Sequence, residues 1–96
     1  MLNNLGAFTV IAQKGATSMP QKAVTAWDSA FAAGFTGASY KPIAYVGKQL
    51  VKGTNRLFIA EQTLATANAE RHIVTIVINE FEGKYTIIKD SIERII

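Results

Sequence analysis

Apolar residues follow two different spacings along this chain, and together these spacings predict one helix among several strands. Within residues 19–33, large apolar side chains recur at intervals of four, three and four, at Pro20, Val24, Trp27 and Phe31. This period places them on one stripe of a helix. Ser18 offers an N-cap before the helix and Gly34 a stop after it. We therefore expect a helix that packs one face against a flat surface.

Runs of β-branched and aromatic residues predict the strands. They lie at residues 39–51, 56–63, 71–80 and 84–89, with a shorter run at residues 7–13. The links at residues 52–55 and 81–83 are short and each contains a glycine, which predicts two hairpins. Residues 64–70, between the hairpins, are expected to form a loop.

The order of these elements predicts an α+β fold, in which one long helix packs across a four- to five-stranded antiparallel sheet. A chain of 96 residues with 49% hydrophobic content can bury one ordinary core. We therefore expect a single domain over residues 1–96. Charge interrupts every apolar stretch well before the roughly 20 residues that a membrane-spanning helix needs, so no membrane contact is expected.

Composition removes several classes of chemistry. The chain has no cysteine, which excludes disulfides, thiolate metal sites and a cysteine nucleophile. The net charge is +3, and the basic residues are scattered singly, which argues against a nucleic-acid surface. The one histidine, His72, has no ligand or triad partner at a suitable spacing. We predict a protein that is not an enzyme and that uses no cofactor and no metal.

One motif carries a functional signal. The first hairpin link reads Gln49-Leu50-Val51-Lys52-Gly53, which fits the Gln-x-Val-x-Gly motif of the cystatins, inhibitors of papain-like cysteine proteases. The element order and the flanking Ser39-Tyr40-Lys41 and Thr54-Asn55 add to this resemblance. The chain lacks the Pro-Trp pair that many secreted cystatins carry in the second hairpin. Together with the absence of cysteine, this makes it similar to the stefins, the cytosolic branch of the superfamily.

The resemblance implies a function and a site. A stefin-like protein is a reversible, tight-binding inhibitor that occludes the protease cleft with an N-terminal trunk and two hairpin loops. The matching residues are Leu5, Gly6, Gln49, Leu50, Val51, Lys52, Gly53 and Glu82, with Gly15 as a competing position for the trunk glycine. Its partner would be a papain-like cysteine protease. We expect a cytoplasmic monomer that can form a domain-swapped dimer by exchanging its long hairpin.

A second hypothesis stays open. The chain can instead be a cystatin-fold binding or scaffold module, natural or engineered, with a non-protease partner that uses the loops or a sheet edge. Its cue is the departure from the family pattern at Lys52, Glu80 and Glu82. An unpaired carboxylate buried in a protease cleft would cost several kcal/mol. Inhibition of papain separates the two hypotheses.

Overall fold

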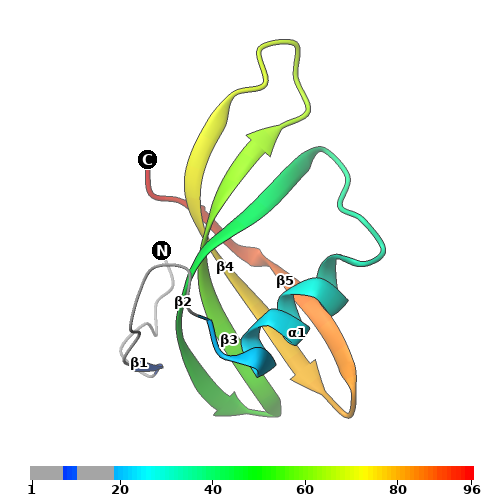
Figure 1. The fold of residues 1–96 in the computed structure, drawn as a ribbon, viewed down its shortest axis with the longest axis vertical. Coiled ribbons are helices and arrows are strands. Elements are labelled where there is room, and N and C mark those ends of the chain that lie inside the picture. The colour runs from blue at the N-terminus through cyan, green and yellow to red at the C-terminus, as the bar shows by residue number, and fades with distance from the viewer. Residues whose placement is uncertain (1–7, 11–18) are drawn as a thin grey trace.

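The computed structural model describes residues 8–10 and 19–96. Their elements are β1 (Thr9–Val10), α1 (Gln21–Phe31), β2 (Ala38–Val51), β3 (Gly53–Leu64), β4 (Arg71–Phe81) and β5 (Lys84–Arg94). The strands form one sheet in the order β1-β2-β3-β4-β5, and each strand is antiparallel to its neighbour. The helix α1 lies across one face of this sheet (Figure 1). The predicted fold class, an α+β fold with one helix across an antiparallel sheet, is confirmed.

The helix is shorter than predicted and buries a different stripe. It runs over Gln21–Phe31, and its buried residues are Ala23, Ala26 and Trp27. Pro20 is exposed and Val24 is only half-buried, so the predicted stripe was wrong at its start. The two alanines have small side chains, which lets the helix axis approach the sheet closely. The proposed N-cap Ser18 lies outside the described residues, and Gly34 follows the helix with a positive φ of 84°.

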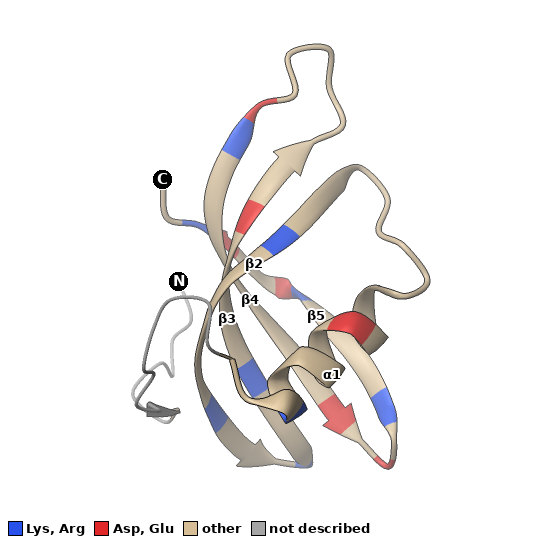
Figure 2. Cartoon of the chain, viewed as in Figure 1, with Lys and Arg blue, Asp and Glu red and all other residues tan. Residues whose placement is uncertain are grey.

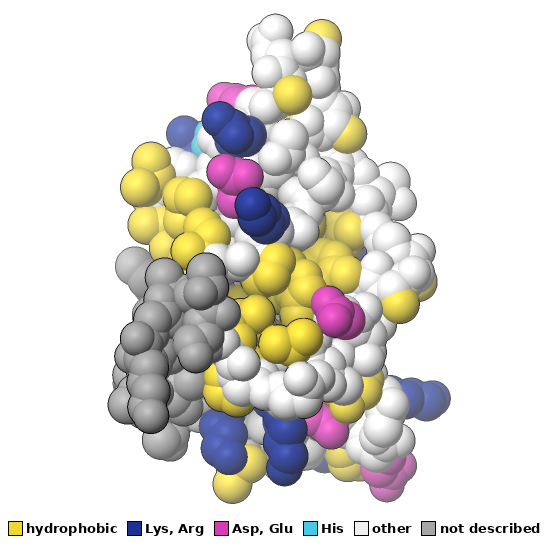
Figure 3. Space-filling view, in the orientation of Figure 1, with side chains coloured by type: hydrophobic (Ala, Val, Ile, Leu, Met, Phe, Trp, Pro, Cys, Tyr) yellow, Lys and Arg dark blue, Asp and Glu magenta, His cyan; other side chains and the backbone are white. Residues whose placement is uncertain are grey.

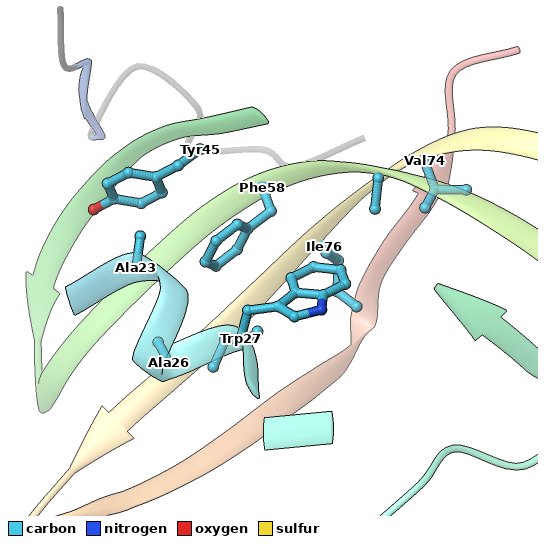
Figure 4. Packing of buried hydrophobic residues seen from close by; sticks show 9 residues of the cluster. Ala23, Ala26, Trp27, Tyr45, Phe58, Val74 and Ile76 are labelled. Atoms are coloured by element: carbon cyan, nitrogen blue, oxygen red, sulfur yellow. The ribbon is translucent and has the colours of Figure 1, made fainter. Parts of the chain in front are cut away.

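The main core lies between the helix and the sheet. Trp27 stacks on Phe31 with ring centroids 4.4 Å apart, and it meets Phe58 of β3 edge-on at 5.2 Å. Tyr45 of β2 adds a further ring 5.3 Å from Phe58. Figure 4 shows the rings of Trp27, Tyr45 and Phe58 between the helix, which carries Ala23 and Ala26, and the sheet. Aromatic pairs at these separations contribute about 0.5–1.5 kcal/mol each beyond the area that they bury.

A smaller apolar cluster lies on the opposite face of the sheet. Leu57 and Val77 are buried there together with Phe8, which immediately precedes β1. Leu57 stands between Arg56 and Phe58 along β3, and strand alternation turns its side chain to the face away from the helix. Phe8 therefore closes a second apolar layer against the sheet.

The strands are longer than the sequence predicted at several ends. The pairing of β2 with β3 continues to Val51↔Gly53, so the predicted link at residues 52–55 is wrong and only Lys52 separates the two strands. Strand β3 extends to Leu64 and β5 to Arg94. Of the predicted strand at residues 7–13, the structure describes residues 8–10 and places Thr9–Val10 in the sheet. Residues 65–70 form the predicted loop.

Candidate functional site

Both hairpin turns lie at the same end of the sheet, near the start of α1 (Figure 1). We call this the tip end. Thr54 pairs with Glu80 across β3 and β4, which brings the β2–β3 turn beside the β4–β5 turn. The approach is closest at Gly53, where an added Cβ would lie 2.2 Å from the backbone oxygen of Glu80. Only glycine fits at this position, and its φ of 86° independently favours glycine.

The β2–β3 turn presents apolar side chains to solvent. Leu50 is 76% exposed and Val51 is 49% exposed, although both belong to a regular strand. Neither belongs to the apolar cores that hold the fold together. Fully burying one such side chain contributes about 1.5–3 kcal/mol. These two residues are therefore available to a partner at little cost to the fold.

A row of amide side chains braces the turn from behind. Gln49, Asn55 and Asn79 occupy adjacent register positions on β2, β3 and β4. The Asn79 Nδ2 donates to Asn55 Oδ1 at 2.8 Å, and the Asn55 Nδ2 donates to Gln49 Oε1 at 3.3 Å. Asn79 Nδ2 also donates to the backbone oxygen of Lys52 at 3.3 Å. The motif residue Gln49 is thus part of a chain of hydrogen bonds that links three strands.

Lys52 bridges the two turns. Its Nζ lies 5.4 Å from the centroid of the Phe81 ring, at the end of β4. An exposed cation–π contact of this kind contributes about 0.5–1 kcal/mol. The sequence left open whether Lys52 points to solvent or meets an acidic partner. In the structure its ammonium group instead covers an aromatic ring of the neighbouring hairpin.

The β4–β5 turn is a two-residue turn with positive φ at both positions. Glu82 has a φ of 49° and Gly83 a φ of 78°, and Phe81 pairs with Lys84 across the turn. Such turns match the twist of a hairpin and favour Asn-Gly or Asp-Gly. Glu82 is therefore a strained choice at an exposed turn, where its carboxylate projects into solvent.

Glu80 does not present an unpaired carboxylate at the tip. Its Oε1 accepts a hydrogen bond from Arg56 Nη1, and its Oε2 accepts one from the Tyr85 hydroxyl at 3.4 Å. The hydrogen bond from Arg56 lowers the pKa of Glu80 from its ordinary value of 4.5, with smaller contributions from Tyr85 and the charge of Lys22. The Arg56 side chain is only 8% exposed. The charge of this nearly buried guanidinium is thus balanced by the Glu80 carboxylate.

A hollow of about 350 Å³ lies between the start of α1 and this ion pair. Lys22, Arg56, Glu80 and Tyr85 are among its lining residues. On the other side of Lys22, a smaller hollow is lined by Tyr45, Lys48 and Arg56. Burial raises the pKa of the Tyr45 hydroxyl above 10.0, although the charge of Arg56 opposes this effect. The larger hollow is mainly polar and the smaller one mainly apolar, and both have Lys22 and Arg56 in their lining and adjoin the tip end.

The predicted site residues fall into two groups. Gln49, Leu50, Val51, Lys52, Gly53 and Glu82 lie together on the two turns of the tip end. Leu5, Gly6 and Gly15 lie outside the described residues. The register of β1, with Thr9 opposite Lys48 and Val10 opposite Gly47, directs the N-terminal end of β1 toward the tip end of β2.

Sequence reasoning missed the roles of Arg56, Asn55 and Asn79. Their contacts join positions 24 residues apart, in both the Arg56–Glu80 pair and the Asn55–Asn79 hydrogen bond. The signal that could have found them is the pairing of β3 with β4. If Thr54 is set opposite Glu80, Asn55 falls directly opposite Asn79, and Arg56 falls diagonal to Glu80 on the same face of the sheet.

His72 is buried, and its Nδ1 lies 3.2 Å from the Ile96 oxygen while its Nε2 lies 3.6 Å from Glu70 Oε2. Among residues 8–10 and 19–96, no group of three or more histidine and acidic side chains could hold a metal ion. No helix of this part of the chain is long and apolar enough to cross a membrane.

Comparisons with known proteins give no match, either among protein-family models or among curated sequences and solved structures.

Proposed function

We propose that this protein is a reversible, stefin-like inhibitor of papain-like cysteine proteases, which fills the active-site cleft with its tip end. The observation that carries the proposal is the meeting of two hairpin turns at one edge, with Leu50 and Val51 exposed on the turn that holds the Gln-x-Val-x-Gly motif. An exposed apolar edge of this kind suits insertion into a cleft. The third contact would come from Leu5 and Gly6, which precede β1 in the sequence, and the support for this is that the N-terminal end of β1 is directed toward the tip end.

Inhibition would need no covalent chemistry. Leu50 and Val51 would enter the cleft beside the catalytic cysteine and exclude substrate. Ladder hydrogen bonds and the amide row of Gln49, Asn55 and Asn79 hold the turn in one shape before binding. A preformed turn loses little conformational entropy when it binds. Glu82 would stay at the solvent-facing side of the second turn, where its carboxylate keeps its water.

The same proposal covers location and assembly. A stefin-like inhibitor without cysteine would act in the cytoplasm, as a monomer. Exchange of the β2 arm between two copies would give the domain-swapped dimer, because β2 and β3 pair over their whole length and meet at a single residue, Lys52. Light scattering after mild heating tests this expectation, since a chain that stays monomeric contradicts it.

Titration against active-site-calibrated papain tests the function. Micromolar protein should inhibit cleavage of a small peptide substrate, and the Val51→Asp variant should bind at least about a hundredfold more weakly, because a buried carboxylate costs several kcal/mol. Ile43→Asp is the matched control, since Ile43 is on the same strand away from the turn and is 39% exposed. Removal of residues 1–5 tests the trunk. No inhibition at micromolar protein contradicts the proposal.

One observation favours the alternative, a cystatin-fold binding module with a non-protease partner. Strand β5 is the last strand of the sheet, and within the described residues its outer edge has no strand partner. A peptide could add to such an edge by backbone hydrogen bonds. If papain affinity survives both Val51→Asp and removal of residues 1–5, the tip end is not the protease-binding surface.

A further inference from the structure

Charge is distributed unevenly along the described residues. At the tip end, basic side chains outnumber acidic ones: Lys22, Lys48, Lys52, Arg56 and Lys84 stand against Glu80 and Glu82. Figure 2 shows blue segments near the lower ends of β2, β3 and β5 and at the start of α1, and Figure 3 shows dark blue side chains at the lower end of the molecule. The net charge of the whole chain is +3, and the excess of basic over acidic side chains at the tip end accounts for a charge of the same size.

Acidic groups accompany the basic ones at the other end of the sheet. Arg71 Nη1 lies 3.8 Å from Glu61 Oε2, and Lys41 is directly opposite Glu61 in the β2–β3 register. His72 similarly faces Glu70. These contacts keep the positive and negative charges of the far end close together, so that end has little net field.

The tip lysines have no such compensation. The charge of Lys22 acts on Glu80, but the Glu80 carboxylate is already bound to Arg56. No salt bridge to Lys22, Lys48, Lys52 or Lys84 is recorded within residues 8–10 and 19–96. Of the two acidic side chains at the tip end, Glu82 is the one that is not bound to Arg56, and it stands against four ammonium groups.

Two of the cations lie next to each other across one strand pair. Lys48 is directly opposite Arg56 in the β2–β3 register, and both line the hollow beside Lys22. Like charges directly opposite each other destabilise an antiparallel pair. Glu80 already offsets the charge of Arg56, so the charge of Lys48 is the one that a negatively charged partner at this surface would neutralise.

We propose that the tip end recognises a papain-like protease whose cleft is rimmed by aspartate and glutamate side chains. This inference rests on the proposed function and specifies its partner. Leu50 and Val51 would supply the apolar contact inside the cleft, while Lys22, Lys48 and Lys84 would face the acidic rim around it. Charges at the rim of an interface act mainly on the rate of association, because they steer the encounter over distances beyond contact.

The inference predicts a specific dependence on salt. The Debye length is about 10 Å at 0.1 M ionic strength and about 3 Å at 1 M, so salt screens steering but leaves apolar contact in place. For an acidic-rimmed protease, the association rate constant should fall at least about tenfold between 10 mM and 500 mM NaCl. The dissociation rate constant should change by less than about threefold, since rim charges act mainly on association.

Stopped-flow inhibition kinetics test this with two papain-like proteases, one with several acidic side chains at the mouth of its cleft and one with none. The variant K22Q/K48Q/K84Q removes tip charges outside the apolar contact. The variant K41Q/K89Q/R94Q removes the same number of charges from other parts of the sheet and is the control. At 10 mM NaCl only the tip variant should associate about tenfold more slowly with the acidic-rimmed protease, while thermal melting shows that both variants are folded.

The outcomes separate the two proposals. If the protein inhibits both proteases with equal association rates and no salt dependence, the inference about an acidic rim is wrong and the inhibitor function stands. The same conclusion follows if the control variant slows association as much as the tip variant does. If neither protease is inhibited at any salt concentration, the inhibitor function fails and this inference fails with it.

Discussion

Gly53 lies against the backbone of Glu80 so closely that even a methyl group at Gly53 would sit 2.2 Å from the Glu80 carbonyl oxygen. The contact joins the motif turn to the neighbouring hairpin. The fold itself therefore requires glycine at this position of the motif, whether or not the protein binds a protease. The two hairpins therefore pack backbone against backbone at this position.

Gly53→Ala should destabilise the protein by at least about 2 kcal/mol, because the new Cβ combines a left-handed backbone with a backbone clash. Urea unfolding measures the change. Gly83→Ala is the matched control, since Gly83 has a φ of 78° but nothing lies within 4 Å of the position of its Cβ. It should cost only about 1 kcal/mol. An equal loss of unfolding free energy in the two variants would show that the contact with Glu80 does not add to the cost of Gly53→Ala.

Asn79→Ala should loosen the motif turn as well as the fold. It removes the donor to Asn55 Oδ1 and to the Lys52 backbone oxygen, and hydrogen bonds of this kind contribute about 1 kcal/mol each. We expect a loss of about 1–2 kcal/mol in urea unfolding and weaker protease inhibition. Thr86→Ala changes the neighbour of Asn79 on β5 and is the control. Full inhibition by Asn79→Ala would contradict a role for the amide row in shaping the turn.

Glu82→Asn should stabilise the protein by up to about 1 kcal/mol, because asparagine tolerates the positive φ at this turn position better than glutamate does. The midpoint of thermal unfolding measures the gain. Glu82→Gln removes the same charge but keeps an ordinary side chain at a φ of 49°. A gain of the same size in Glu82→Gln would assign the effect to charge and not to the backbone.

Glu80 should make stability depend on pH on the acid side. Arg56 lowers the pKa of this carboxyl in the folded state, so its contribution is present above the ordinary value of 4.5. The contribution is lost as the pH falls through the lower folded-state pKa. Glu80→Gln should therefore lose less stability than the parent protein between pH 5 and about pH 3 in urea unfolding.

Glu61→Gln is the control for this pH effect. Glu61 lies 3.8 Å from Arg71, whose side chain is 68% exposed, and exposed pairs contribute little to stability. The free energy of unfolding of Glu61→Gln should fall with decreasing pH in the same way as that of the parent protein. If Glu80→Gln follows the parent curve as well, the Arg56–Glu80 pair is not a source of the acid dependence.

The sequence predicted the order of the elements because local patterns determine them. Spacing located the helix and Trp27, and the β-branched runs located the strands. The buried helix face was partly wrong, since Ala23 and Ala26 carry little hydrophobic weight in a pattern but fit a close helix–sheet contact. The spacing of apolar residues predicts which large side chains are buried, but it does not predict where small side chains let a helix pack closely on a sheet.

The details of the tip end depend on contacts between distant parts of the chain. The extension of β3 back to Gly53 is stabilised by its neighbour β4, which no property of residues 52–55 reveals. The Arg56–Glu80 pair likewise needs the β3–β4 register. The motif located the turn, but only the fold shows what supports it.

Phe8, near the start of the chain, contributes to the stability of the fold. Its ring completes the layer over Leu57 and Val77 on the sheet face away from α1. A deletion that stops before Phe8 reports on the proposed trunk alone. A deletion that also removes Phe8 would expose the apolar side chains of Leu57 and Val77 and favour aggregation. A loss of inhibition in that variant would then reflect a destabilised protein and not the missing trunk. The boundary for any shortened version of this molecule therefore lies between Gly6 and Phe8.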